Sequence, residues 1–414
     1  MSGALAKKEK KHPLGRWVDD RFPLSKLWNE HVAQYYAPKN FNFWYYFGSL
    51  ALFVLVIQLV TGIWLAMSYK PDAGLAFGSI ELIMRDVEWG WLIRYLHSTG
   101  ASAFFIVVYL HMFRGFLYGS YKKPRELLWI IGMVIYFALM AEAFFGYLLP
   151  WGQMSYWGAQ VITSLFGAIP VIGEDLALWI RGDYVVSDVT LNRFYSYHVI
   201  AVPLVLIGLV WAHIMALHEV GSNNPDGIEI KYHKDPQGRP LDGIPFHPYY
   251  TVKDMVGMVV FLILFALVVF FAPELGGWFL EHNNFEPANP IKTPEHIAPL
   301  WYLTPYYAIL RAIPDKLLGV LAMGVAIFIF FLLPWLDRSP VKSIRYRGPL
   351  YRWALAIFAI SFVVLGYLGT QSPTEILMWL ARIFSILYFA FFFLMPFYTR
   401  WDKDKPVPER VTSK

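Results

Sequence analysis

Eight long apolar stretches constrain the fold of this chain more than any other feature of its sequence. Each contains about 20 residues or more, the length of helix that crosses the roughly 30 Å hydrocarbon layer of a bilayer. The first stretch contains no charged residue. The sequence therefore predicts an all-α, polytopic membrane protein with eight transmembrane helices. The predicted spans are 43–68, 92–118, 127–149, 190–218, 252–273, 317–336, 350–369 and 375–399.

The composition agrees with lipid as the surrounding solvent. Hydrophobic residues make up 57% of the 414 residues and charged residues only 16%, whereas about a quarter of a soluble domain is charged. The absence of cysteine excludes disulfides, thiolate-bound clusters and covalent cofactor attachment through Cys-x-x-Cys-His. The eleven histidines are then the plausible nitrogen ligands for a metal. The net charge of +5 is spread over loops and tails, so we interpret it as a topology signal and predict no nucleic-acid partner.

The distribution of lysine and arginine predicts the orientation in the membrane. Basic residues concentrate in 1–42, in the connections after the second, fourth and sixth spans, and in 400–414. The segments 69–91, 150–189 and 274–316 are poorer in basic residues for their length. Because short cytoplasmic loops carry an excess of lysine and arginine, we expect both termini to be cytoplasmic. The segments 150–189 and 274–316 are too long to be simple connecting loops, so we expect short amphipathic helices in them.

Four histidines form two matched pairs in the second and fourth predicted spans. His97 and His111 are fourteen residues apart, and His198 and His213 are fifteen apart. At about 100° per helical residue, each pair shares one helix face, with roughly 21 Å between its members along the axis. Pro203 lies inside the second pair, where a local kink or bulge would absorb the extra residue.

The topology predicts how these histidines face each other. Both spans run from outside to inside, so His97 faces His198 near the outer surface. His111 then faces His213 near the inner surface. Two imidazoles across a gap are the ligand set of a six-coordinate haem, which transfers electrons. A lone intramembrane histidine is more often a hydrogen-bonding or proton-relay residue, and zinc would need further ligands on the same faces. The matched pairs favour two non-covalently bound haems in a four-helix core.

Glycines on the first and third predicted spans repeat at the same interval as the first histidine pair. Gly48 and Gly62 are fourteen residues apart, and so are Gly132 and Gly146. Small residues at two levels would let a flat macrocycle lie against the helix backbone. The alternative is ordinary tight packing of membrane helices, which also favours small residues.

Two arginines in the second span are candidate partners of haem propionates. Arg94 and Arg114 each lie three residues from a candidate ligand histidine. An arginine inside lipid is costly unless it is paired, and Ser120 offers an additional hydrogen bond. The alternative is that both arginine side chains extend to the lipid headgroups.

Several longer motifs, distributed along nearly the whole chain, resemble one family closely. Besides the four histidines, the resemblance rests on GYLLPWGQMSYWGA (146–159), LHEVGSNNP (217–225), FHPYYTVKD (246–254) and PLWY (299–302). These segments look like cytochrome b of the quinol:cytochrome c oxidoreductase, the cytochrome bc complex. An undivided eight-span chain resembles the respiratory form, and the basic tail and fifteen-residue histidine spacing resemble bacterial members.

The resemblance implies a function. Quinol would be oxidised near the outer surface, with one electron passing to a Rieske iron–sulfur protein and cytochrome c1. The other electron would pass through two haems b to a quinone-reduction site near the inner surface, and proton translocation would accompany this transfer. The family also implies a homodimeric complex in a cell inner membrane, with quinone and membrane lipid as further partners.

The outer quinol site implied by the resemblance combines the end of the third span with the PLWY segment. Aromatic walls suit a flat quinone ring, although aromatic residues also line membrane interfaces in general. The matching positions are Tyr147, Pro150, Trp151, Gly152, Tyr156, Pro299 and Tyr302.

The sequence departs from the family at one position of this site. The familiar motif is Pro-Glu-Trp-Tyr, whose glutamate is usually assigned a role in accepting a quinol proton, but this chain has Leu300 there. Glu142 lies in the third span, five residues before Tyr147, and a carboxylate in an apolar span is costly and functional by default. Our hypothesis is that Glu142 replaces the missing glutamate as proton acceptor. The alternative is a structural hydrogen bond to a neighbouring helix.

The inner quinone site would use residues near the cytoplasmic ends of the fourth and fifth spans. A histidine and an aspartate there can hydrogen-bond the two quinone carbonyls and pass protons inward. The alternative role of Asp254 is that of a charge at a helix N-terminus. The expected residues are His218, Ser222, Lys253 and Asp254, with Asn42 as a further candidate.

These expectations divide the chain into five parts. They are a cytoplasmic basic N-terminal segment (1–42), a haem-binding transmembrane domain of five spans (43–273), an outer quinol-site loop (274–316), a C-terminal transmembrane domain of three spans (317–399) and a cytoplasmic tail (400–414). Two other interpretations stay open. A haem-free transporter or channel with an intramembrane polar path would be colourless. A two-haem anchor of another quinol-linked enzyme would not co-purify with an iron–sulfur protein and a c-type cytochrome.

Overall fold

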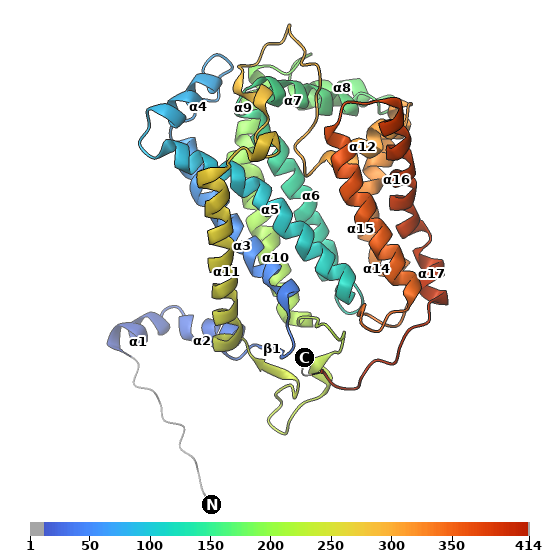
Figure 1. Ribbon diagram of the computed structural model, residues 1–414. Helices are drawn as coiled ribbons and strands as arrows, with labels where there is room; N and C mark the ends of the chain where they lie inside the picture. The colour runs from blue at the N-terminus through green and yellow to red at the C-terminus, as the bar shows by residue number, and fades with distance from the viewer. Residues whose placement is uncertain (1–11, 413–414) are drawn as a thin grey trace, which may run out of the picture.

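The computed structural model describes residues 12–412 as a bundle of long helices with shorter helices at both ends (Figure 1). Within that range, eight helices are long and apolar enough to cross a membrane. The predicted number of spans is therefore confirmed. The helices are α3 (Tyr46–Ala66), α5 (Gly90–Tyr118), α6 (Glu126–Leu148), α9 with α10 (Asp188–Ser196 and Val202–Val220), α11 (Phe246–Phe271), α13 with α14 (Lys316–Phe328 and Leu333–Leu336), α15 (Pro349–Thr370) and α16 (Glu375–Phe393).

Short helices cover the upper end of the bundle in Figure 1, and three of them lie in the two segments, 150–189 and 274–316, where the sequence predicts short helices. Two of these helices lie across the bundle in the first long outer segment, and another follows the PLWY motif. A helix between the first two spans was not predicted. These elements are α4 (Ala76–Arg85), α7 (Gln153–Phe166), α8 (Gly173–Arg181) and α12 (Thr304–Ala312), with 3-10 turns at Leu275–Gly277 and His282–Phe285.

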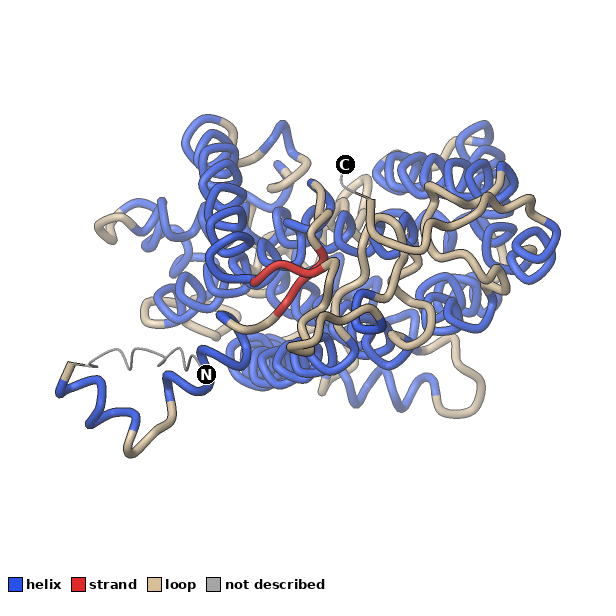
Figure 2. Tube along the Cα trace, turned by 90° about the horizontal axis from the view of Figure 1, so that it is seen from below, coloured by secondary structure: helices blue, strands red, loops and turns tan. Residues whose placement is uncertain are grey.

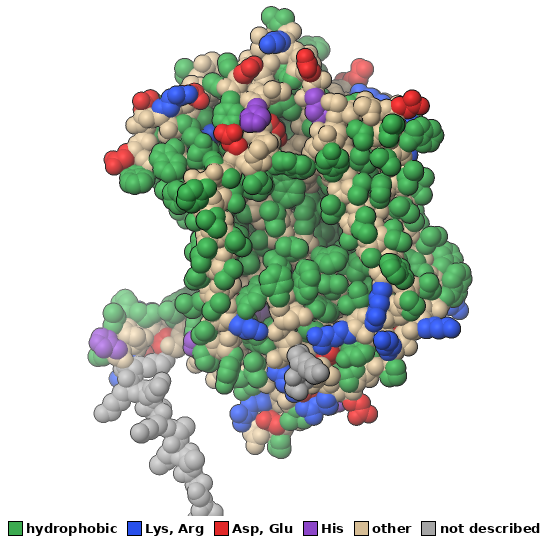
Figure 3. All heavy atoms as spheres, in the orientation of Figure 1, with side chains coloured by type: hydrophobic (Ala, Val, Ile, Leu, Met, Phe, Trp, Pro, Cys, Tyr) green, Lys and Arg blue, Asp and Glu red, His purple; other side chains and the backbone are tan. Residues whose placement is uncertain are grey.

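The opposite end carries both ends of the described chain. A short antiparallel ladder joins the segment before the first span to the segment before the fifth (Figure 2). Figure 3 shows a hydrophobic belt on the visible face, with lysine and arginine gathered mainly below it. The elements at this end are α1 (Pro13–Asp19), α2 (Leu24–Trp28), a π-helical turn (Asn29–Ala33), β1 (Tyr36–Pro38), a 3-10 turn (Phe43–Tyr45), a second 3-10 turn (Ile230–Tyr232), β2 (Gly243–Pro245) and α17 (Met395–Trp401).

Four of the long helices form the core that carries the candidate ligands. α3 packs along α5, and α6 packs along α10. The two histidine-bearing helices, α5 and α10, run in the same direction through the bundle (Figure 1). The two glycine-bearing helices, α3 and α6, each lie beside one of them. This arrangement puts the predicted glycine and histidine faces on neighbouring helices.

A π-helical segment explains the unequal spacing of the two histidine pairs. It covers Tyr197–Ala201, between α9 and α10, and contains His198. A π-turn accommodates one more residue than an α-turn, and Pro203 directly after it has no backbone N–H to continue the α-helical pattern. The bulge predicted near Pro203 is therefore confirmed, and it keeps His198 and His213 on one face despite their fifteen-residue separation.

A buried ionic cluster ties the helical core to the C-terminal helices. Asp337 follows α14 and accepts hydrogen bonds from Arg347 Nη2 at 2.5 Å and from Tyr121 Oη at 2.6 Å. Lys122 Nζ lies 2.9 Å from the same carboxylate. Burial opposes ionisation of Asp337, but Arg347 and Lys122 outweigh it and hold the pKa of the carboxyl below its ordinary value. The connection after α5 is thereby joined to the connection before α15.

We expect Asp337→Ala to destabilise the protein strongly. Removing one partner of a buried ion pair typically costs about 3–5 kcal/mol, because the remaining charge is left without compensation. The matched control is Lys26→Ala, which breaks an exposed pair with Glu30 and should cost less than about 1 kcal/mol. Thermal unfolding in detergent measures both. Equal unfolding temperatures for the two variants would contradict the assigned role of the cluster.

Candidate functional site

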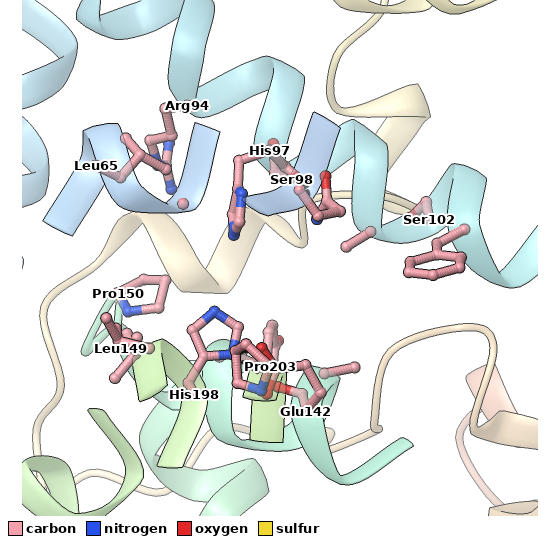
Figure 4. Close-up of a pocket in the computed structure, with 18 of the residues that line it drawn as sticks. Leu65, Arg94, His97, Ser98, Ser102, Glu142, Leu149, Pro150, His198 and Pro203 are labelled. Carbon is pink, nitrogen blue, oxygen red and sulfur yellow. Dashed lines mark hydrogen bonds and ion pairs between the residues drawn. The ribbon is translucent and has the colours of Figure 1, made fainter. Parts of the chain in front are cut away.

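The structure brings the four candidate ligand histidines together in the two predicted pairs. The ring centroids of His97 and His198 are 6.1 Å apart, and those of His111 and His213 are 6.4 Å apart. Figure 4 shows His97 and His198 pointing toward one another across a gap. Because a metal–imidazole bond is about 2 Å long, two imidazoles on opposite sides of one metal have centroids on the order of 6 Å apart. Both separations fit a metal between the rings.

The ligand chemistry at these pairs suits a haem. Within residues 12–412, no group of three or more His, Cys, Asp and Glu side chains is arranged to hold a metal ion. A bare transition-metal site usually takes more ligands from the protein than two imidazoles. A haem iron already has four nitrogens from its macrocycle, so two axial histidines complete its coordination. The paired histidines therefore match a bis-imidazole haem at each level.

Hydrogen bonds hold the two outer rings in orientation. Nδ1 of His97 lies 2.9 Å from the hydroxyl of Thr61. Nδ1 of His198 lies 3.0 Å from both the backbone oxygen and the carboxylate Oε1 of Glu142. A partner on Nδ1 fixes the ring and leaves Nε2 for the iron. Thr61 was not among the predicted site residues, because its only signal in the sequence is a hydroxyl next to Gly62 in an apolar span.

The four predicted glycines lie directly against the candidate ligand rings. A Cβ atom on Gly62 would lie 3.1 Å from Cε1 of His97, and one on Gly146 would overlap the ring of His198. The His198 ring can therefore reach its position only because Gly146 has no side chain, and a methyl group at any of the other three glycines would make a tight contact with the facing ring. The facing pairs are Gly62 with His97, Gly146 with His198, Gly48 with His111, and Gly132 with His213.

The two predicted arginines point toward the same levels. Arg94 lines the cavity around the outer histidine pair, and Figure 4 shows its side chain directed into that region. Arg114 donates a hydrogen bond to the Ser120 hydroxyl at 3.1 Å and lies over the ring of Tyr45. Its Nε atom is buried without a hydrogen-bond partner among the described residues. An unpaired buried donor beside His111 fits a carboxylate such as a haem propionate.

The cavity around the outer histidines extends to three of the predicted quinol-site residues, Tyr147, Pro150 and Tyr302. The other predicted positions do not line it; they are Trp151, Gly152, Tyr156 and Pro299. The cavity is enclosed by helix residues on one side and by the PLWY segment on the other, although these lie about 150 residues apart in the sequence. Its walls include Arg94, His97, Glu142, Tyr147, Pro150, His198, Leu300 and Tyr302. A flat substrate bound against Tyr147 and Tyr302 would therefore lie next to the outer histidine level.

Stacking and hydrogen bonds fix the PLWY segment against α5. The ring of Tyr302 stacks on Phe105 with centroids 3.9 Å apart and an angle of 4° between the planes. Trp301 Nε1 donates to the Ser102 hydroxyl at 3.1 Å. Pro299 directly precedes the buried Leu300. The segment is thus held rigidly enough to form a wall of the cavity.

The predicted inner residues lie around the chain segment that precedes α3. His218, near the end of α10, stacks on Tyr35 with centroids 4.4 Å apart. Lys253 donates to the backbone oxygen of Phe41 at 3.1 Å. Asp254 is half-buried in the next position of α11. The additional candidate, Asn42, hydrogen-bonds Tyr118 at 2.7 Å. Ser222 is half-buried just beyond α10.

Two family models and a full-length relative show which family this chain belongs to. The family model described as Cytochrome b/b6/petB matches residues 32–221, and the one described as Cytochrome b(C-terminal)/b6/petD matches residues 287–389. The protein named cytochrome b from Allochromatium vinosum is 65% identical over 407 residues, which cover 96% of this chain and 98% of that protein. The chain belongs to the cytochrome b family.

Other members of the cytochrome b family show the same full-length likeness. Cytochrome b of Rhodospirillum rubrum is 50% identical and covers 96% of each chain. Cytochrome b of Solanum tuberosum is 46% identical over 93% of this chain and 94% of that protein. A chain of the solved structure titled "Hyperthermophilic respiratory Complex III" matches with a TM-score of 0.87 and 43% identity, over 94% of this chain and 99% of that chain. The predicted fold and family are confirmed.

Two carboxyl groups lie close to the outer cavity of this cytochrome b family member. Glu142, the predicted proton acceptor, lines the cavity and contacts His198, while its Oε2 atom is buried without a hydrogen-bond partner among the described residues. Its role in proton transfer stays a prediction. Sequence analysis did not single out Glu281, whose Oε2 accepts a hydrogen bond of 2.8 Å from Tyr147. Its place in a long loop left no periodic signal from which this contact could be predicted.

We expect Gly146→Ala to disturb the outer haem site selectively. The added methyl group would overlap the His198 ring, so haem content should fall from two per chain toward one. The matched control is Gly208→Ala on α10, where a Cβ atom meets nothing within 4 Å. Haem quantification and a reduced-minus-oxidised spectrum measure both variants. Full haem content with an unshifted spectrum in Gly146→Ala would contradict the packing argument.

Proposed function

We propose that this chain is the cytochrome b subunit of a respiratory quinol:cytochrome c oxidoreductase. It would oxidise quinol at the outer cavity and reduce quinone near the inner end of the bundle. The observation that carries this proposal is the pair of facing imidazoles at each of two levels, 6.1 and 6.4 Å between ring centroids. Haem iron bound there would supply one-electron transfer between the two levels.

Each haem would be held by one histidine from α5 and one from the fourth span, where His198 lies in the π-helical segment and His213 in α10. The outer haem would use His97 and His198, and the inner haem would use His111 and His213. Within a helix, the two levels are separated by roughly 21 Å. Moving one charge across a membrane potential involves about 2.3 kcal/mol per 100 mV. Electron transfer between the two levels would therefore be coupled to the membrane potential. This coupling supports the proposal that the protein takes part in proton translocation.

The outer quinol site would be formed by cavity residues with distinct roles. Tyr147 and Tyr302 supply aromatic surfaces and hydroxyl groups beside the outer histidine pair. Pro150 shapes the turn after α6, and Pro299 leads into the Leu300 wall. Exclusion of water by this apolar lining would keep the substrate next to the electron acceptor. We propose that one of the two electrons of quinol leaves here for a Rieske iron–sulfur protein and cytochrome c1.

The inner quinone site would use His218 and Asp254 as proton-transfer groups. Both are half-buried near the inner ends of their helices, where protons can arrive from the cytoplasm. Lys253 and Ser222 would complete the polar surroundings of the bound quinone. Hydrogen bonds from a histidine and a carboxyl group to the two carbonyl oxygens would orient the ring for reduction.

Partners and location follow from the same proposal. The matched solved chain comes from a structure titled as a respiratory Complex III. A relative from Bradyrhizobium diazoefficiens is named cytochrome b/c1, and this chain covers 57% of it at 46% identity. We propose that this chain assembles with cytochrome c1 and a Rieske protein in a homodimeric complex of the cell inner membrane. The excess of basic residues at one end supports a cytoplasmic location for both termini.

Haem quantification in a ligand variant tests the proposed function directly. The wild-type chain should show two b-type haems in a reduced-minus-oxidised spectrum. His111→Leu should lose the inner one, because a bis-imidazole haem needs both axial ligands. His233→Leu serves as the control, because this histidine lies in an exposed loop. A colourless wild-type protein would favour the haem-free transporter, and an unchanged spectrum in His111→Leu would contradict the ligand assignment.

We expect Asp254→Asn to slow quinone reduction at the inner site by about 100-fold or more, because a positioned acid typically contributes at least that much. The measurement is the rate at which quinone reoxidises the reduced haems when outer-site turnover is blocked. Glu219→Gln, which alters an exposed carboxylate beside His218, is the control. Equal reoxidation rates in Asp254→Asn and wild type would remove Asp254 from the proposed inner site.

A further inference from the structure

A loop carboxyl group reaches the outer cavity from outside the PLWY motif. Tyr147 lines the cavity and donates its hydroxyl hydrogen to Oε2 of Glu281 at 2.8 Å. Phe279 and Leu280, which directly precede Glu281, and Asn284 three positions later also line the cavity. Glu281 is therefore connected to the cavity by a single hydroxyl group, in a segment that itself forms part of the cavity wall.

Hydrogen bonds hold this loop against the start of α7. Asn284 accepts from the backbone N–H of Ser155 at 2.8 Å and donates to its hydroxyl at 2.9 Å. The backbone of Gln153 donates to Glu286 at 3.0 Å. A side chain on Gly152 would collide with Asn284, so the close approach depends on glycine. The position of Glu281 over Tyr147 is thus set by the surrounding backbone contacts.

The protein environment prepares this carboxyl group for proton transfer. Burial raises the pKa of Glu281 to about 7, although the hydrogen bond from Tyr147 opposes the shift. Leu300, at the motif position where the family has glutamate, cannot accept a proton. The carboxylate of Glu142 already contacts Nδ1 of His198, so this carboxylate serves to orient the ring of a candidate ligand. Glu281 has no contact with a candidate ligand histidine among the described interactions.

We propose that Glu281 is the proton acceptor for quinol at the outer site, acting through the hydroxyl group of Tyr147. This inference rests on the proposed function of the cavity. The step concerns one of the two quinol protons. One quinol O–H bond breaks as its proton passes to the Tyr147 oxygen, and the tyrosine's own proton forms the new O–H bond on Glu281. Tyr147 ends as it began, and the carboxylate becomes a carboxylic acid. The electrons follow the two routes of the proposed function.

The surroundings of Glu281 also provide a route by which the proton leaves. Glu281 is half-buried and is followed by the exposed His282. His282 Nδ1 lies 3.9 Å from Oε2 of Glu274, so the same loop carries two further titratable groups whose side chains are accessible to solvent. Release of the accepted proton through these groups would deliver it to the side that the proposed function requires.

The experiment compares Glu281→Gln with Glu286→Gln in the intact oxidoreductase complex. Glu286 is exposed in the same loop, and only its backbone contributes to the contacts with α7. We expect Glu281→Gln to lower the rate of oxidation of a short-chain benzoquinol by at least about tenfold. Haem content and reduction by dithionite should be unchanged, and Glu286→Gln should retain the wild-type rate.

The pH profile separates proton transfer from a structural role. The groups facing Glu281 are Tyr147 and Tyr302, with the exposed His282 and the partly exposed Glu274 in the same loop. Because only the ionised carboxylate accepts a proton, the wild-type kcat/KM should fall as the pH drops below about 7. Glu281→Gln should lose this acidic limb. Tyr147→Phe, which removes the connecting hydroxyl, should lower the rate with the same haem content.

Three results would overturn the inference. The first is a wild-type rate in Glu281→Gln or in Tyr147→Phe. The second is a lowered rate in Glu281→Gln that keeps the full acidic limb, which would mark a structural role. The third is loss of the limb in Glu142→Gln while Glu281→Gln retains it, which would return the role to Glu142. Absence of quinol oxidation in the wild-type complex would instead contradict the proposed function.

Discussion

The contact between a glycine backbone and a histidine ring is the interaction on which this structure depends. It occurs four times, at two levels of the bundle, between α3 and α5 and between α6 and α10. At each level the glycines allow two imidazoles to stand opposite one another with ring centroids 6.1 or 6.4 Å apart. Helix packing and ligand geometry therefore depend on each other, because a side chain at Gly146 would overlap the His198 ring and one at Gly62 would press against the His97 ring.

The outer histidine level and the outer cavity share their walls. Residues of α5, α6 and the fourth span form the wall of the cavity that includes the outer histidines. The PLWY segment forms the opposite wall and is held there by stacking of Tyr302 on Phe105. The same α6 that presents Gly146 to His198 also presents Tyr147 to the cavity. In the proposed function, a substrate beside Tyr147 would lie close to the outer haem because Gly146 and Tyr147 are adjacent on one rigidly packed helix.

Sequence reasoning worked best where a helix in lipid leaves little freedom. Backbone groups in a bilayer must be hydrogen-bonded within their own segment, so a long apolar stretch must be helical. Residue spacing then translates directly into position, which explains why the histidine pairs, the glycines and even the bulge near Pro203 were predicted. Two features could not be predicted from helical spacing. Thr61 is a single hydroxyl in an apolar run, and Glu281 belongs to a loop without periodicity.

The sequence by itself determined the number of spans, the parallel course of α5 and α10, and the two levels of paired histidines. These depend on hydrophobic length and helical periodicity, which are local properties of the chain. Only the tertiary structure decided that Glu142 contacts His198 and that Glu281 meets Tyr147. Both contacts join segments separated by 56 and 134 residues, and such distant pairings are set by packing between elements rather than by any local pattern.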